Sequence, residues 1–428
     1  MTDDWRRLHP LTPVLRGWRF LLIAAAAVGQ QGLRQSDGVD PVYLGLAIVA
    51  ATSVAVLVGF VAWRTTRYRL TATELQVDSG LLQRRSRRVP LARLQSVDVV
   101  RPVIARVLGL AELRLEVVGG GSTEAPLAYL HEADAQRLRA RLLARAAGRA
   151  DEVGPPATDA VLVAVPTGTL VASVLLGFPL VVTVVMLAAV VIVAGLQASA
   201  AVPILFATLP AYAGFMTVAV RRVLAEYGFT VAESPDGLRL RHGLLDTRSQ
   251  TIPPGRVQSV RVLQPLFWRP WGWVRVEVDV AGYERSGGEE QSATSALLPV
   301  APRALAEALV GRVLGGGLPV AAAPAPRRAR WRAPLSARRL AAGLDDRHLV
   351  TTHGVLTTTT DVVPLAKVQS LRLTSGPWQR RLGLATLHAD TAGRRLPGGT
   401  AQHRDADEAR ALLAEVSLRA RTARRHVA

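Results

Sequence analysis

One nine-residue motif occurs three times in this chain. It reads VPLARLQSV from Val89, IPPGRVQSV from Ile252 and VPLAKVQSL from Val363. A glycine lies ten positions before the proline each time, and another lies fourteen positions after the glutamine. The positions that keep this spacing are Gly80, Pro90, Gln95, Ser96 and Gly109; Gly243, Pro253, Gln258, Ser259 and Gly272; and Gly354, Pro364, Gln369, Ser370 and Gly383. Repetition at fixed spacing predicts three copies of one structural unit.

The copies lie too far apart for a solenoid. Gln95 and Gln258 are 163 residues apart, and Gln258 and Gln369 are 111 apart. We therefore expect three separate domains, over residues 66–148, 226–316 and 340–424. The Ala-, Pro- and Arg-rich segment 318–339 between the last two is expected to be an extended, solvated linker.

Each copy has the pattern of a sheet followed by a helix. In the first copy, Leu113, Leu115 and Val117 alternate with Arg114 and Glu116, which predicts strands with one buried face. Each copy then ends in a segment with apolar residues three and four apart, as in an amphipathic helix. The pattern predicts a small antiparallel β-barrel or sandwich closed by one C-terminal helix.

Two long apolar regions predict membrane-spanning helices. Residues 43–63 contain no charge, and residues 161–220 contain no Lys, Arg, Asp or Glu. About 20 apolar residues suffice to cross a bilayer as a helix. We expect two hairpins, 16–64 with helices 18–34 and 43–63, and 161–220 with helices 169–196 and 202–220. The fold class expected is thus an α+β membrane protein with four transmembrane helices and three β-barrel domains; hairpins buried inside a soluble protein are the alternative.

Charge predicts the orientation. The chain has 52 Lys and Arg against 33 Asp and Glu, a formal net charge of +19. Four arginines precede the apolar residues 20–33, and three follow the apolar residues 43–63. They are Arg6, Arg7, Arg16 and Arg19, and Arg64, Arg67 and Arg69. Because basic residues favour the cytoplasmic side, we expect a multi-pass protein of the cell membrane. The N-terminal tail 1–15 and the soluble domains would be cytoplasmic. Residues 20–33 are short for a span, so whether they cross fully stays open.

No pattern for catalysis or metal binding stands out. The chain has no Cys, and none of its eight His forms an HExxH motif. No glycine-rich loop is followed by Lys and Ser or Thr, as a P-loop requires. We expect no enzyme activity, no metal and no cofactor. The repeated Gln-Ser pair could bond to the backbone where a strand leaves the sheet, or it could line a ligand groove.

A basic cluster occurs in the first copy alone. It consists of Arg84, Arg85, Arg87 and Arg88, and its counterparts read TRSQT in the second copy and TTTDV in the third. A solvated loop is one interpretation. The other is contact with anionic lipid of the inner leaflet, where each Arg could contribute ~1 kcal/mol. We expect this segment to be a loop that faces the bilayer.

The order of hairpin, domain, hairpin and two further domains resembles bacterial pleckstrin-homology-like (PH-like) membrane proteins of the YdbT and YdbS type. The residues that carry the resemblance include YRLT at Tyr68–Thr71 and the repeated motif itself. The resemblance implies PH-like β-barrels capped by a helix and no catalytic residues. It also implies a link to envelope stress and antimicrobial-peptide tolerance, and a smaller YdbS-like membrane protein as a partner.

These observations favour a non-enzymatic membrane scaffold whose PH-like domains bind lipid, peptide or protein. The alternative is a component of a small-solute or ion transporter or channel. Against it, the apolar segments carry no ionisable residue, which substrate paths usually need. Nucleic acid is not expected as a partner, because the arginines are scattered and no aromatic stacking platform accompanies them.

Overall fold

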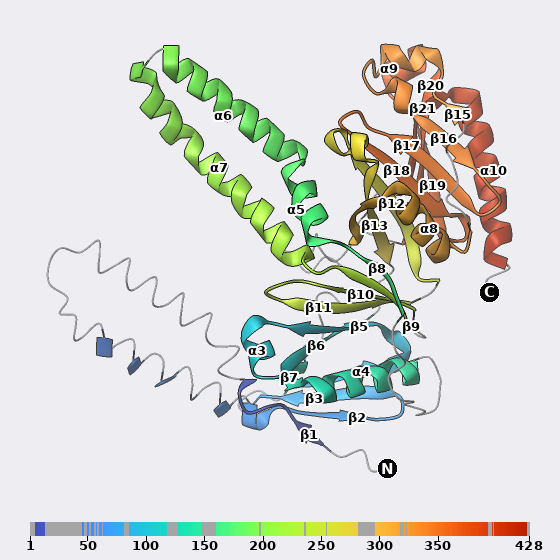
Figure 1. The fold of residues 1–428 in the computed structure, drawn as a ribbon. Helices are drawn as coiled ribbons and strands as arrows, with labels where there is room; N and C mark the ends of the chain where they lie inside the picture. The colour runs from blue at the N-terminus through green and yellow to red at the C-terminus, as the bar shows by residue number, and fades with distance from the viewer. Residues whose placement is uncertain are drawn as a thin grey trace. The chain divides into compact units, whose positions relative to one another are not determined.

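A computed structural model of the chain describes two compact units (Figure 1). The first consists of Met1–Ala157 with Asp246–Gln250, and the second of Thr158–Leu245 with Thr251–Ala428. The structure describes residues 5–12, separate positions between 45 and 61, 63–80, 85–117, 127–146, 160–196, 198–234, 237–253, 255–280, 296–316, 321, 323–392, 396 and 398–425.

Copy 1, in the first unit, contains strands of two antiparallel sheets, a short helix and a closing helix. The first sheet has the order β1-β2-β3-β4, with β1 (Arg6–Arg7), β2 (Arg67–Leu70), β3 (Glu74–Ser79) and β4 (Arg85–Pro90). A 3₁₀ turn, η1 (Leu91–Arg93), leads into β5 (Leu94–Arg101), α3 (Val103–Val107), β6 (Leu110–Val117), β7 (Leu127–His131) and the closing helix α4 (Glu132–Ala146). Leu75, Leu113, Leu115 and Leu142 are fully buried in the core that these elements enclose.

Copies 2 and 3 repeat this plan. Copy 2 contains β8 (Ala160–Ala164), β9 (Thr230–Ser234), β10 (Gly237–His242), β11 (Thr247–Ile252), β12 (Val257–Pro265), η2 (Leu266–Trp271), β13 (Trp273–Val280), β14 (Ala296–Pro302) and α8 (Arg303–Leu314). Copy 3 contains β15 (Ala323–Pro324), η4 (Arg327–Trp331), η5 (Ala337–Arg339), β16 (Ala341–Leu344), β17 (His348–His353), β18 (Thr357–Pro364), η6 (Leu365–Lys367), β19 (Val368–Thr374), α9 (Pro377–Arg381), β20 (Leu384–Thr391), β21 (Gly399–Asp405) and α10 (Ala406–Arg425).

The conserved spacing has a backbone explanation. Gly109, Gly272 and Gly383 have φ of 67°, 62° and 61°, in the left-handed region that favours glycine. Each ends a short helical segment, and its carbonyl accepts the backbone N–H of the first residue of the closing helix. The three bonds, from Glu132, Arg303 and Ala406, measure 3.0, 3.0 and 2.9 Å. The repeated glycine thus joins the last sheet of each copy to its helix.

The Gln-Ser pair marks an irregularity in the same strand of every copy. The register of β5 with β6 shifts between Leu94 and Ser96, that of β12 with β13 between Val257 and Ser259, and that of β19 with β20 between Val368 and Ser370. The glutamine is therefore the extra residue of a β-bulge, which bends the strand as it leaves the corner.

The copies are joined by strand pairing. β11 pairs antiparallel with β5, with Val99 opposite Ser249. The paired residues of β11 belong to the first unit. β18 of copy 3 pairs antiparallel with β12 of copy 2, with Val262 opposite Thr360. When the copies are aligned on their glutamines, Val99 corresponds to Val262 and Ser249 to Thr360. The two joints therefore have the same register.

An additional N-terminal strand begins each copy. β1 pairs with β2, β8 with β9 and β15 with β16, all antiparallel. In copy 2 the chain between β8 and β9 forms three helices, α5 (Thr167–Leu175), α6 (Phe178–Leu196) and α7 (Ala198–Glu226). This helical hairpin is thus an insertion within copy 2, whereas the sequence placed it between two domains.

The hairpin is anchored to copy 2 at its base. The indole Nε1 of Trp268 donates to the carbonyl of Ser173 on α5 at 3.0 Å, and both residues are buried. Farther along, the Tyr212 hydroxyl on α7 donates to the Thr183 carbonyl on α6 at 3.3 Å. α6 and α7 run side by side as an antiparallel pair (Figure 1).

The prediction of transmembrane helices needs correction. In the part of the chain that the structure describes, no helix combines the length and the apolarity needed to cross a membrane. The helix expected over 18–34 lies outside the described residues, as do parts of the one expected over 43–63. For 169–196, the expected continuous helix is divided: α5 ends at Leu175 and α6 begins at Phe178.

The expected β-barrels are also a correction. The described strands form four open antiparallel sheets. One has four strands, one has three, and two have seven strands each. The longer sheets arise because strands of successive copies pair, and such pairing uses the edges that closure within a copy would have required.

Part of the expected linker has structure of its own. β15, η4 and η5 lie within 318–339, and Ala329 and Ala337 are buried against Leu384 of copy 3. The expectation of an extended, solvated tether is therefore wrong for these residues, because the alanines pack against copy 3 and Arg339 donates to the Val355 carbonyl at 3.1 Å.

Gly354 provides a test of the turn geometry. Its φ is 96°, and a Cβ at this position would lie 2.0 Å from the carbonyl oxygen of Thr357. We expect Gly354→Ala to lower the free energy of unfolding by about 1–3 kcal/mol, because the backbone must move. Gly316→Ala is the matched control, since nothing lies within 4 Å of its Cβ position. Equal chemical-denaturation midpoints for the two variants would contradict this explanation.

Candidate functional site

The basic cluster of copy 1 lies on a strand. Strand β4, at the edge of the first sheet, contains Arg85, Arg87 and Arg88. The prediction that this segment is a loop is therefore wrong. Arg84 lies outside the described residues. The side chains of Arg87 and Arg88 are exposed. β4 pairs with β3, with Arg87 opposite Val77 and Arg88 opposite Gln76.

The counterparts of these arginines are buried. Arg87 corresponds to Gln250 in copy 2 and to Asp361 in copy 3, which are 3% and 2% exposed. Both counterparts lie on strands that pair with the preceding copy. Among the described strands, β4 has one neighbour, β3, so the position of Arg87 lies at a sheet edge and not at a joint.

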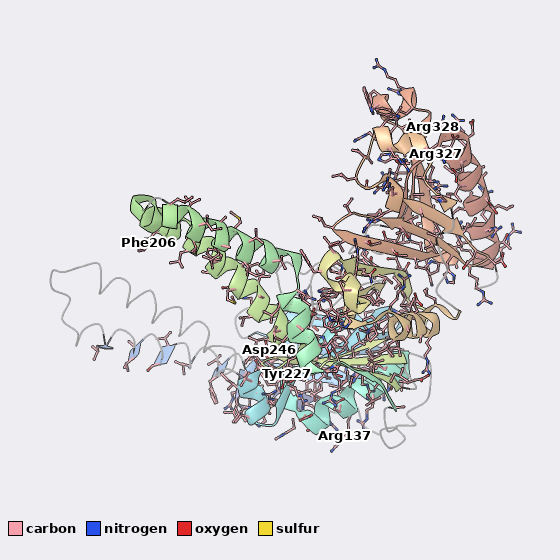
Figure 2. All side chains as sticks on the ribbon, turned by 45° about the horizontal axis from the view of Figure 1, so that its top comes forward. Arg137, Phe206, Tyr227, Asp246, Arg327 and Arg328 are labelled. Atoms are coloured by element: carbon pink, nitrogen blue, oxygen red, sulfur yellow. The ribbon has the colours of Figure 1, made fainter. Side chains whose placement is uncertain are left out.

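The hairpin of copy 2 presents a second unusual surface. Four consecutive apolar residues of α6, Val184 to Leu187, are between 39% and 62% exposed. Four residues exceed one turn of 3.6, so α6 is apolar around its whole circumference here. Phe206 on α7 is 68% exposed, and Figure 2 shows it near the far end of the hairpin. A helix that is hydrophobic on all sides normally lies in a protein core or in lipid.

A buried ionic cluster fixes the end of α7. Glu226 is 2% exposed and lies 2.6 Å from Arg275 on β13 and 3.2 Å from Arg222 on α7. Arg275 also contacts Glu277 at 2.9 Å. The Arg222 guanidinium lies 5.8 Å from the centre of the Trp268 ring. Burial by itself raises the pKa of Glu226, but Arg275 and Arg222 outweigh it and lower that pKa. The cluster thus ties the hairpin to the sheet of copy 2.

This cluster was missed from the sequence. The only local signal is that Arg222 and Glu226 are four residues apart on an amphipathic turn. Arg275 comes from a strand 49 residues away, so the pairing depends on the tertiary fold.

The joint between copies 2 and 3 contains a further buried ion pair. Arg261 on β12 contacts Asp361 on β18 at 2.6 Å, and His353 lies 3.7 Å from the same carboxylate. Burial raises the pKa of Asp361, and the opposing effects of Arg261 and His353 do not cancel this. Burial also lowers the pKa of His353, ahead of the raising effect of Asp361. Arg261 and Asp361 lie opposite each other on the paired strands β12 and β18, and His353 lies on the neighbouring strand β17.

The Gln-Ser pairs have different surroundings. In copy 2 the Gln258 amide donates to the Arg256 carbonyl at 3.2 Å, and Ser259 is buried. In copy 3 the Ser370 hydroxyl donates to Asp390 at 2.8 Å, and Gln369 is exposed. The side chains of Gln95 and Ser96 lie outside the described set. Among the described residues, no group of three or more His, Asp or Glu could hold a metal ion.

Comparison with known families matches this architecture. The model of the bacterial PH domain matches residues 20–146, 160–317 and 315–420, most of the chain. The chain belongs to the bacterial PH domain family. The three matches correspond to the three copies, and the second includes the helical insertion between β8 and β9.

A more distant relative is the "UPF0699 transmembrane protein YdbT" of Bacillus subtilis (strain 168). It is 25% identical over 95 residues, which are 22% of this chain and 19% of the relative. The chain therefore matches about a fifth of that protein's length, and it is a bacterial PH protein similar to YdbT. No solved structure matches the chain.

Replacement of Glu226 tests the anchor of the hairpin. Glu226→Gln removes the buried carboxylate that Arg275 and Arg222 share, and Arg275 keeps only Glu277, so we expect a loss of about 3 kcal/mol of stability. The matched control Glu307→Gln removes an exposed pair with Arg303 and should cost about 0–1 kcal/mol.

The same residue gives a pH dependence. The folded-state pKa of Glu226 lies below its ordinary value of 4.5. Its stabilising contribution is therefore present above pH 4.5 and is lost as the pH falls through the lower pKa of the folded state. Chemical-denaturation midpoints measured from pH 7 to pH 3 should fall less steeply in Glu226→Gln than in the unmodified chain. Parallel profiles would show that the carboxylate is not ionised in the fold.

Proposed function

We propose that this chain is a non-enzymatic, membrane-associated scaffold of the cytoplasmic face, which holds three PH-like domains in fixed order to bind lipid and a protein partner. The observation that carries the proposal is the exposed apolar hairpin α6–α7, anchored by buried contacts to a PH-like copy. A rigid base with an apolar extension suits attachment of a scaffold to a lipid surface.

Exposed apolar area supports lipid contact by the hairpin. Several side chains of α6 and α7 are more than half exposed, among them Val185, Ile192, Leu196 and Phe206. Burying one such side chain in an apolar medium contributes ~1.5–3 kcal/mol. Contiguous apolar surface of this extent marks an interaction site for a membrane or another protein. The relative named as a transmembrane protein supports the membrane.

The arginines of β4 support a preference for anionic lipid. Arg87 and Arg88 are exposed on adjacent positions of an edge strand, and the chain carries a net charge of +19. Juxtamembrane arginines near anionic headgroups contribute ~1 kcal/mol each. The anionic inner leaflet is accordingly the proposed lipid partner, and a smaller YdbS-like protein is the proposed protein partner. A role in envelope stress, which the family resemblance implies, is part of the proposal.

The absence of enzyme activity also remains a proposal. Its support is that the strongly coupled ionic groups, at Glu226 and Asp361, are buried and paired with arginines in structural contacts. Such networks perturb pKa values without forming an active site.

Charged substitutions in the hairpin test attachment to lipid. We expect Val185→Glu with Ile192→Glu to reduce co-flotation of the full chain with vesicles at least tenfold, because each substitution places a charge in the apolar contact. Leu335→Glu with Leu418→Glu is the matched control, since these leucines are 80% and 68% exposed in copy 3. Circular dichroism checks that the sheets persist. Equal losses in both double variants would argue against a specific role of the hairpin.

Neutral substitutions on β4 test the lipid preference. Arg87→Gln with Arg88→Gln should lower the ratio of binding to anionic over neutral vesicles, by about tenfold or more at low salt. The matched control replaces Arg327 and Arg330, two exposed arginines of η4 in copy 3 (Figure 2 labels Arg327). A ratio that stays unchanged in the β4 variant would refute lipid contact by this strand.

A further inference from the structure

Strand β19 of copy 3 occupies a position that is paired in the other copies. It corresponds to β5 and β12, as alignment on Gln95, Gln258 and Gln369 shows. β5 lies between β6 and β11, and β12 lies between β13 and β18. β19 is the edge of the three-stranded sheet β19-β20-β21, and among the described strands its one neighbour is β20.

Side chains of β19 are more exposed than their counterparts in the paired strands β5 and β12. Ser259 and Val260 of β12 are 2% and 0% exposed, whereas their counterparts Ser370 and Leu371 are exposed and half-buried. Leu373 is 37% exposed, while its counterpart Val99 on β5 is 2% exposed. The strand therefore keeps apolar side chains of the kind that the internal joints cover.

The internal joints define what a missing neighbour would look like. Both are antiparallel and share one register. At the second joint, Arg261 lies opposite Asp361 and contacts it at 2.6 Å. The counterpart of Arg261 on β19 is Arg372, which is exposed and already contacts Asp390 of its own sheet at 2.9 Å. An acidic residue opposite Arg372 would reproduce the second joint.

We propose that the edge of β19 binds an extended strand of a different polypeptide, antiparallel and in the register of the internal joints. The strand carries an acidic residue opposite Arg372 and an apolar, β-branched residue opposite Leu371, as β18 does at Asp361 and Val362. Addition of a strand to a sheet edge uses main-chain hydrogen bonds for affinity and side-chain pairs for specificity. This proposal adds a mode of partner binding to the proposed scaffold function and does not depend on lipid binding.

A second copy of this chain is the poorer occupant. The strand that would complete the joint from another copy is β4, which in the first sheet has one neighbour, β3, among the described strands. In the shared register Arg87 of β4 would lie opposite Arg372, because Arg87 is the counterpart of Asp361. Like charges directly opposite each other in a sheet are destabilising. Charge therefore selects a partner strand from a different chain.

A peptide of the chain's own joint strand serves as the probe. Its sequence is TTTTDVVP, residues 357–364, labelled with a fluorophore, and a second peptide has arginine in place of the residue at Asp361. Fluorescence anisotropy with the full chain should show that the acidic peptide binds at least about fivefold more tightly than the basic one. With the Arg372→Glu variant of the chain, the preference should reverse.

The reversal assigns the binding to β19. A peptide that displaced β18 from β12 would face Arg261, so Arg372→Glu would leave its preference unchanged and the proposal would be wrong. Arg410→Glu is the matched control, because Arg410 is exposed on α10 and 66% accessible. Absence of binding by either peptide would also overturn the proposal, while the vesicle result for the hairpin would stand.

Sedimentation of the unmodified full chain distinguishes the remaining occupant. We expect no concentration-dependent association that substitutions at the edge strands β4 and β19 alter. Oligomers that change with Arg87→Glu or Arg372→Glu would show that a second copy occupies the edge, and the assignment to a different chain would be wrong.

Discussion

Pairing of a strand in one copy with a strand of the preceding copy is the interaction on which this architecture depends. β11 completes the sheet of β5, and β18 completes the sheet of β12, in one shared register. The backbone groups of a central strand must be hydrogen-bonded on both sides once water is excluded. Burial of Gln250, Asp361 and Val362 follows from this pairing, as does the close contact of Arg261 with Asp361. The joint makes a sheet that no single copy could form.

The same pairing explains how copies of one fold can differ. Residues at equivalent positions have opposite character where the neighbour differs. Arg87 is exposed at an edge, whereas Asp361 is buried at a joint. Copies that share their glycines and their bulges therefore differ at joint positions of their fourth strand, as Arg87, Gln250 and Asp361 show. The fifth strand of one copy and the fourth strand of the next are the elements that pair between copies.

The helical hairpin is built into the domain plan. β8 precedes it, β9 follows it, and the two strands pair. The Trp268–Ser173 bond and the Glu226 cluster hold its base against copy 2. In copy 3 the corresponding interval between β15 and β16 holds η4 and η5 instead. The domain thus tolerates very different insertions after its first strand. The strands before and after the insertion pair with each other in the sheet, so the inserted residues only connect their ends.

The sequence by itself determined the three copies, their closing helices and the positions where the backbone must turn. These features are local. Glycine is favoured at positions 109, 272 and 383 because φ is positive there, and the extra residue of each bulge keeps the same place in the motif. It also led to the family, on motif residues whose spacing is fixed by that backbone.

Only the tertiary structure decided which strands pair between copies, where the hairpin is inserted, and which charges are buried. Main-chain hydrogen bonds are alike for every sequence, so the identity of a neighbouring strand depends on the path of the chain. For the same reason the expected closed barrels were wrong: alternation in a strand predicts a buried face, but it does not say which edge meets which. The arginines of β4 were visible in the sequence, while their place at an open edge required the fold.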